Sequence, residues 1–413
     1  MEPPSDRNDA YASLRVKDFR SFVTAYFFLT FALQMQSVVV GWQVYQLTHD
    51  ALSLGLIGFV EVAPFLTIVL FTGHVADVFS RKKIIVVSTL VYVLAGIALL
   101  LLSTVFGKVL LSHGPFAIYL VIFITGIARG FMSPAILALM PQLVPREMFG
   151  NASTWNSLTW QVGEVTGPAA GGLIYGFSGA GSAYATVVIV SIIAFIAYLM
   201  VSDKPLPKRN QELSIKESLS EGVKFVFNHE IILSAVTLDM FAVFFGGAVA
   251  VLPIFADRIL QAGPEGLGIL RAAPAVGAIV MSIIQAHRPF LDRAGRSLII
   301  SVFGFGVSII VFALSRNMLL SLGALFANGL CDNVSVVLRT AIIQLHTPDE
   351  LRGRVSAVNG IFTGASDGLG SFESGFAARL LGLIPSVVIG GGVTLATAAT
   401  ARSLSPKLWN LKM

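Results

Sequence analysis

The stretch "GEVTGPAAGG", residues 163–172, carries four glycines, one proline and one carboxylate inside a long apolar segment. In a soluble helix each glycine would cost roughly 1 kcal/mol relative to alanine, and an interior proline roughly 3 kcal/mol. In a bilayer, small residues let two helix backbones approach closely, and neighbouring helices can satisfy the carbonyl that a proline frees. Residues 163, 167 and 171 are spaced by four and so share one helical face. We therefore predict a bent membrane-spanning helix with a hinge and seal at Gly163, Gly167, Pro168, Gly171 and Gly172.

The composition of the whole chain places this helix among many others. The 413 residues are 55% hydrophobic and only 12% charged, whereas a soluble protein carries about a quarter charged residues. Cys331 is the single cysteine, which rules out a disulfide within the chain. Apolar runs near twenty residues, each long enough to cross a bilayer, predict an all-α membrane protein with twelve spans at 21–47, 52–72, 84–106, 116–140, 150–176, 183–202, 231–256, 266–287, 297–315, 318–345, 355–378 and 383–401.

The basic residues predict how these spans are oriented. With the amino terminus inside, 21 of the 28 lysines and arginines fall in cytoplasmic segments. Such a bias sets topology by the positive-inside rule, so both termini are expected in the cytoplasm. It also explains the net charge of +5 without any nucleic acid as a partner.

Three pairs of segments indicate that the chain contains an internal repeat. "GLIGFVEVAPFL" (55–66) matches "GLGILRAAPAVG" (266–277), with Gly58 over Gly268 and Pro64 over Pro274. Residues 141–156 match 343–359, and "DVFSR" (77–81) matches "DRAGR" (292–296). Two six-span halves in parallel repeat are typical of transporters. We expect a cytoplasmic segment (1–20), two halves (21–202 and 231–401), a linker (203–230) with a lateral helix or no structure, and a cytoplasmic tail (402–413).

The segment "GHVADVFSRKKII" (73–85) resembles the signature loop of the major facilitator superfamily, although Ser80 replaces its second glycine. The resemblance implies the fold of that superfamily and a loop that latches the two halves. Asp77 can face the positive end of a helix, and Arg81 is expected to pair with an acid such as Glu147. The alternative is a basic loop that only sets topology. The predicted cytoplasmic gate comprises Gly73, Asp77, Arg81, Lys82, Glu147, Asp292, Arg296 and Glu350.

Further stretches refine this resemblance. Residues 163–172 match the pattern that marks the exporting, antiport-type branch of the superfamily, in which span 5 packs against span 8. Gly268, Ala272, Ala273 and Gly277 of span 8 are small enough to accept it, or the motif serves packing alone. Residues 133–157 and 347–362 resemble a bacterial exporter group that includes the enterobactin exporter. The resemblance implies export of a siderophore-like or drug-like molecule, coupled to proton antiport.

Nine ionisable residues fall inside the predicted spans, and each would cost about 2.5–3.5 kcal/mol if it faced lipid at mid-membrane. Three pairs are matched by the repeat (61 with 271, 129 with 332, 164 with 367), which predicts one central cavity. Three arginines can neutralise three acids, and the other three acids are free to exchange protons or hold cargo. Static roles are expected for Arg339 and Glu373, and a substrate and proton pathway for Glu61, Arg129, Glu164, Asp239, Arg271, Asp332 and Asp367.

No pattern in the chain indicates an enzyme. The sequence offers no Ser/His/Asp constellation, no metal-spaced histidines or cysteines and no phosphate loop, so neither cofactor nor metal is expected. We expect a monomeric secondary transporter in the bacterial inner membrane, whose partners are a small-molecule substrate, protons and the lipid bilayer. Uptake or lipid flipping on the same fold, or a sensor that does not transport, are the alternatives.

Overall fold

A computed structural model of the chain describes residues 9–205, 215–287, 293–348 and 351–411. The N-terminal half contains α1 (Ala12–Arg15), α2 (Lys17–Thr48), α3 (Ala51–Val78), α4 (Arg81–Leu102), α5 (Val105–Leu111), α6 (Phe116–Leu139), η1 (Met140–Gln142), η2 (Arg146–Met148) and α7 (Phe149–Leu199). The helix α8 (Ile215–Asn228) follows in the linker region. The C-terminal half contains α9 (Glu230–Gly246), η3 (Ala248–Val251), α10 (Leu252–Ile254), η4 (Phe255–Ile259), α11 (Gly263–His287), α12 (Ala294–Leu314), α13 (Met318–His346), α14 (Arg352–Leu381), α15 (Leu383–Leu404) and α16 (Pro406–Trp409).

These helices make twelve crossings, as the sequence predicts. Ten of the described helical segments are long and apolar enough to span a membrane. One of them contains two crossings, because α7 turns at Gly179, whose φ of 78° and ψ of 176° suit only glycine. The 30-residue α14 is the remaining crossing, and its charged and hydroxyl side chains explain why it is less apolar than the others.

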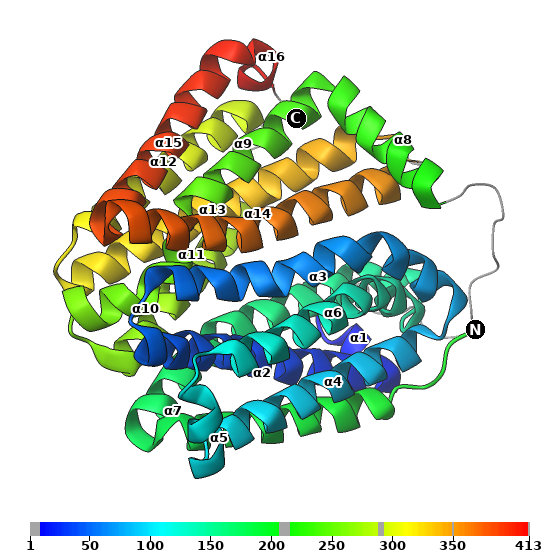
Figure 1. Cartoon of the computed structure of the whole chain (residues 1–413). Coiled ribbons are helices and arrows are strands. Elements are labelled where there is room, and N and C mark those ends of the chain that lie inside the picture. The colour runs from blue at the N-terminus through cyan, green and yellow to red at the C-terminus, as the bar shows by residue number, and fades with distance from the viewer. Residues whose placement is uncertain (1–8, 206–214, 288–292, 349–350, 412–413) are drawn as a thin grey trace.

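The two six-helix halves share a hydrophobic core at one end and have separate cores at the other. We call the end with the α2–α3 turn and Gly179 the far end, and the end with residues 9 and 411 the termini end. One cluster of buried residues joins both halves at the far end. A second cluster lies only in the N-terminal half and a third only in the C-terminal half, both at the termini end. Figure 1 shows the halves as two layers, with α3 and α14 facing each other.

Contacts at the far end correct the register of the repeat. A Cβ atom added at Gly172 of α7 would lie 2.7 Å from Cα of Gly268 in α11. In the other half, a Cβ atom at Gly375 of α14 would lie 2.7 Å from Cα of Gly55 in α3. The contact of α7 with α11 is thus repeated by α14 with α3. Because Gly172 corresponds to Gly375, Gly268 corresponds to Gly55. The sequence match to Gly58 was wrong by three residues.

A second pair of contacts gives the same register. Gly126 of α6 packs on the carbonyl oxygen of Glu61, and Gly329 of α13 packs on that of Pro274. The counterpart of Glu61 is therefore Pro274, and the predicted match between Glu61 and Arg271 is wrong. A shift of three residues is close to one helical turn, so glycine and proline recur on nearly the same face in either register.

At the termini end, the segment after α7 is bound to the start of α2 in the N-terminal half. Asp18 near the start of α2 accepts hydrogen bonds from the backbone N–H (3.1 Å) and Oγ (2.9 Å) of Ser202. Nζ of Lys204 lies 2.6 Å from the same carboxylate. We call these three residues the N-clamp. It links the segment after the last crossing of this half to the start of the first crossing.

The C-terminal half has an equivalent fastening. Lys407 and Ser405 stand 203 positions after their counterparts Lys204 and Ser202. Nζ of Lys407 lies 2.5 Å from the carboxylate of Glu230 at the start of α9. Oγ of Ser405 lies 2.8 Å from Oγ of Ser234. We call Glu230, Ser234, Ser405 and Lys407 the C-clamp. Nothing in the helical periodicity pointed to either clamp.

Candidate functional site

Four charged side chains come from the middle of crossing helices in both halves. Arg129 lies in α6 and Asp332 lies 203 positions later in α13. Glu164 in α7 and Asp367 in α14 are related by the same interval. Asp367 interacts electrostatically with Arg129 of one half and Arg339 of the other, so it lies between the halves. The structure thus brings together the central charges that the sequence predicted.

Within the N-terminal half, Glu61 and Arg129 form an ion pair. Nη1 of Arg129 lies 2.8 Å from Oε1 of Glu61, and their side chains are 47% and 39% exposed, respectively. The guanidinium group also lies 5.8 Å from the centre of the Phe65 ring. Because both side chains are partly exposed, a water molecule can reach the pair.

Within the C-terminal half, Asp239 and Arg339 form an ion pair that is buried. Their side chains are 4% and 5% exposed, respectively. Ser335 donates to Asp239 at 3.0 Å, and Arg339 donates to Thr363 at 3.2 Å. The static role predicted for Arg339 agrees with this geometry. Asp239, which the sequence predicts on the transport pathway, is the partner of Arg339, and their hydrogen bonds join α9, α13 and α14.

Arg271 of α11 forms no direct ion pair with a carboxylate of the described residues, contrary to the expectation that all three central arginines would pair with an acid. Its Nη1 donates to Oγ of Ser37 in α2 at 3.0 Å, and this hydrogen bond links the two halves. Arg271 interacts electrostatically with Glu61 and Glu164, but without direct contact. The corrected register explains the difference, because Arg271 stands a turn away from the position equivalent to Glu61.

Glu164, Asp332 and Asp367 are left without an ion pair or side-chain hydrogen bond in the described part of the chain. Glu164 interacts electrostatically with both aspartates, and the aspartates interact with each other. We call these three residues the carboxylate triad. A proton or a cation bound among them would relieve their mutual repulsion. Glu373 lies apart, two residues from the Gly375 contact.

The glycines of the opening stretch face two different neighbours. Cβ atoms at Gly163 and Gly171 would meet Thr30 at 3.0 Å and the Met35 carbonyl at 2.9 Å. The position between them, Gly167, would meet the Phe31 carbonyl at 2.7 Å. This face therefore packs on α2 in the same half, and the prediction that it packs on span 8 is wrong.

The contact between α7 and span 8, which is α11, is made by the neighbouring face. A Cβ atom at Gly268 would lie 2.7 Å from the Pro168 carbonyl and 3.0 Å from Cα of Gly172. Gly172 follows Gly171 by one residue, and one residue rotates the helix by about 100°. The seal thus rests on Pro168 and Gly172, whereas the stripe spaced by four holds the half together.

A polar latch that the sequence did not reveal also closes the far end. Oη of Tyr45 in α2 donates to Asp257 at 2.7 Å and accepts from Nε of Arg258 at 3.1 Å. Both partners lie in η4, a single π-helical turn. Arg379 of α14 lies 3.7 Å from Asp50 at the start of α3. The latch joins residues 212 or more positions apart, which local sequence patterns cannot indicate.

The predicted gate at the termini end is arranged differently from expectation. Nη1 of Arg81 donates to the Ala138 carbonyl at 2.9 Å. No ion pair joins it to Glu147, which is exposed in η2. The last carbonyls of a helix lack partners within it and carry partial negative charge, so the end of α6 competes for the guanidinium. Nζ of Lys82 lies 4.0 Å from Asp203.

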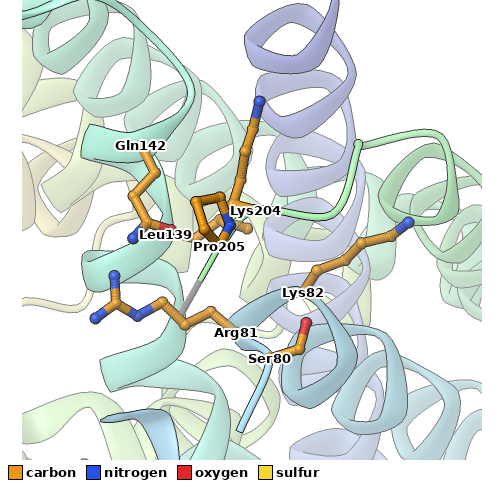
Figure 2. Close-up of a pocket in the computed structure, with 7 residues that line it drawn as sticks. All are labelled: Ser80, Arg81, Lys82, Leu139, Gln142, Lys204 and Pro205. Carbon is orange, nitrogen blue, oxygen red and sulfur yellow. The ribbon is translucent and has the colours of Figure 1, made fainter. Parts of the chain in front are cut away.

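Figure 2 shows the small pocket at this gate. Its residues come from the start of α4 with its N-cap, from the end of α6 with η1, and from the segment after α7: Ser80, Arg81, Lys82, Leu139, Gln142, Lys204 and Pro205. The backbones of Gly73 and Asp77 belong to α3, but the surroundings of their side chains lie outside the described residues. Asp292 and Glu350 also lie outside them. Arg296 stacks on Trp409 at 5.3 Å, so it contacts the tail within its own half.

Comparison with known proteins agrees with this architecture. A sequence profile described as Major Facilitator Superfamily matches residues 22–371. The enterobactin exporters EntS of Shigella boydii and of Escherichia coli are each 25% identical over 391 residues, which cover 90% of this chain and 91% of theirs. Both relatives span the two halves and the linker.

Solved structures support the fold alone, because their sequences are distant. A D-xylose-proton symporter is 14% identical, has a TM-score of 0.70 and covers 96% of this chain and 99% of its own. A bacterial homologue of the lysosomal transporter Spinster, in an inward-facing and unoccupied conformation, is 15% identical with a TM-score of 0.72. That match covers 95% of this chain and 96% of the other. The chain is a multi-pass membrane protein and belongs to the Major Facilitator Superfamily of transporters.

Proposed function

We propose that this protein exports a small organic molecule by proton antiport. The observation that carries the proposal is the carboxylate triad. Glu164, Asp332 and Asp367 come from both halves and form no direct ion pair among the described residues, whereas Glu61 and Asp239 each have an arginine in direct contact. Carboxylates placed in this way can take up a proton when cargo leaves and release it when cargo binds.

The closed far end supports alternating access. The glycine contacts at Gly172 and Gly375 and the latch at Tyr45 close that end. The hydrophobic core divides into two at the termini end. The central charges are thus positioned to receive cargo from the side of the termini. Opening the far end would require the halves to separate at Gly172 and Gly375 and to approach at the termini end.

The direction of transport is proposed from the basic residues. Their bias puts the termini in the cytoplasm, so cargo would enter from the cytoplasm and leave outside. The named activity of the EntS relatives, enterobactin export, supports the same direction. A siderophore of that kind, or a drug-like amphiphile, is the cargo class that we propose.

The test uses purified protein in vesicles with a pH-sensitive dye trapped inside. Enterobactin and the cationic dye ethidium serve as the two probes. We expect an imposed pH gradient to drive uptake of one probe, with proton movement in the opposite direction. Asp332→Asn or Asp367→Asn should lower this coupled flux at least about tenfold, a loss of about 1.4 kcal/mol.

The control is Asp9→Asn, which removes a carboxylate paired with Arg15 at the termini end. Its flux should match that of the unaltered protein. Proton movement in the same direction as the probe would favour uptake over export. Unchanged coupling in both triad variants would disprove the role proposed for the triad.

A further inference from the structure

Residues 405–411 fold back onto the C-terminal half. Leu408 of α16 is fully buried, and the backbone N–H of Gly295 donates to the Leu411 carbonyl at 3.3 Å. The short helix therefore lies against the first turn of α12, with the C-clamp holding it to α9. Trp409 is thereby fixed in position at the termini end of the membrane-spanning helices.

Two guanidinium groups lie over the ring of this tryptophan. The central carbons of Arg296 and Arg402 are 5.3 Å and 4.8 Å from the ring centre, respectively. Cation–π contacts of this kind favour a positive charge at the ring face. The two charges stand within about 10 Å of each other, which is about one Debye length at 0.1 M salt.

These charges are not neutralised by acids in the described part of the chain. Arg296 and Arg402 are exposed, as is Arg293 at the start of α12, and none of them forms an ion pair there. Glu230, the acid nearest in the clamp network, is engaged by Lys407. A cluster of positive charge therefore remains open to an anion from outside the chain.

Apolar side chains continue from the cluster toward the membrane interior. Ile300 and Phe303 follow Arg296 by one and two turns of α12 on the same face, and they are 62% and 48% exposed, respectively. Tryptophan and arginine are typical of the interface between headgroups and hydrocarbon. The same face thus offers positive charge at headgroup level and an apolar surface below it.

We propose that Arg296, Arg402 and Trp409 form a binding site for the phosphate group of an anionic phospholipid, whose acyl chains lie along Ile300 and Phe303. The charge of the headgroup would offset the repulsion between the two guanidinium groups. The proposal depends on the membrane-spanning fold and not on the direction or coupling of transport. In the N-terminal half the sequence places Leu206 at the position of Trp409, so the site belongs to one half only.

The test is native mass spectrometry of the protein in detergent with phosphatidylglycerol or phosphatidylethanolamine added. We expect at least about a fivefold preference for the anionic lipid, equal to about 1 kcal/mol. Arg296→Gln/Arg402→Gln should abolish the preference, and Arg402→Gln alone should reduce it. Thermal unfolding in each lipid, measured on the same samples, should show the same order.

The matched control is Lys83→Gln/Arg146→Gln, which removes two exposed positive charges at the same end of the other half. Its preference should equal that of the unaltered protein. Equal loss in both double variants would show general electrostatic attraction and overturn the site. Complete displacement of the lipid by inorganic phosphate would also overturn the site. The absence of any lipid preference in the unaltered protein would do the same.

Discussion

Among the described residues, each half has one arginine–carboxylate pair in the middle of its crossing helices, yet the two pairs differ in burial by an order of magnitude. Glu61 and Arg129 are 39% and 47% exposed, whereas Asp239 and Arg339 are 4% and 5% exposed. A buried pair must be held by further hydrogen bonds, which Ser335 and a threonine of α14 provide. The comparison teaches that the same kind of ion pair can stay partly exposed in one half and be buried in the packing of helices in the other.

The ion pairs of the two clamps also differ in burial, but here the buried pair lies in the N-terminal half and the exposed pair in the C-terminal half. The side chains of Lys204 and Asp18 are 24% and 15% exposed, while those of Lys407 and Glu230 are 68% and 47% exposed. The N-clamp is therefore the better shielded ion pair. Its counterpart relies on the burial of Leu408 as well as on charge.

The largest expected effect comes from breaking the buried pair. Arg339→Gln leaves Asp239 as an uncompensated buried charge, which should lower the free energy of unfolding by about 3–5 kcal/mol. Arg129→Gln in the exposed pair should lower it by less than about 1 kcal/mol, yet impair transport. Denaturation of the purified proteins in detergent measures the first effect, and vesicle flux measures the second.

A second substitution tests whether the buried pair acts as a unit. Asp239→Asn/Arg339→Gln removes both charges and should recover part of the stability lost in Arg339→Gln. Equal destabilisation by Arg339→Gln and Arg129→Gln would contradict the distinction between the two pairs.

The next largest effect should separate contacts between halves from contacts within one. Gly172→Leu would collide with Gly268 of the other half, at a cost of about 2–3 kcal/mol, and should make the far end leak protons. Gly167→Leu would collide with α2 in its own half, so it should lower stability without a leak. Gly150→Leu is the control, because no atom lies within 4 Å of a Cβ atom there. A leak in Gly167→Leu and none in Gly172→Leu would reverse the assignment.

The smallest effect should rank the two clamps. Lys204→Met leaves the half-buried carboxylate of Asp18 with Ser202 as its one remaining partner among the described residues, at a cost of about 1–2 kcal/mol. Lys407→Met removes an exposed ion pair and should cost less than about 1 kcal/mol. Thermal unfolding of both variants at low and high salt gives the ranking. The stability lost in Lys407→Met should depend more strongly on salt than the stability lost in Lys204→Met. A larger loss in Lys407→Met would show that exposure does not decide the strength of the clamps.

Much of the fold could be predicted from the chain itself. The crossings, the division into halves and the position of α14 follow from runs of apolar residues and from the interval of 203 positions that relates Glu164 to Asp367. Central charges could also be predicted, because ionised groups in a bilayer must face inward. Their partners could not. Arg271 was expected to pair with an acid and instead binds Ser37, and Arg81 binds a helix end instead of Glu147.

The sequence by itself determined where the chain crosses the membrane and which residues carry charge there, because hydropathy and helical period are local properties. Only the tertiary structure decided which face of α7 forms the seal, which register relates α3 to α11, and which carboxylates remain unpaired. A shift of three residues or a step around a helix hardly changes the apolar pattern, but it changes which atoms come within bonding distance. For that reason Gly167 and Gly172, five positions apart, contact different halves of the molecule.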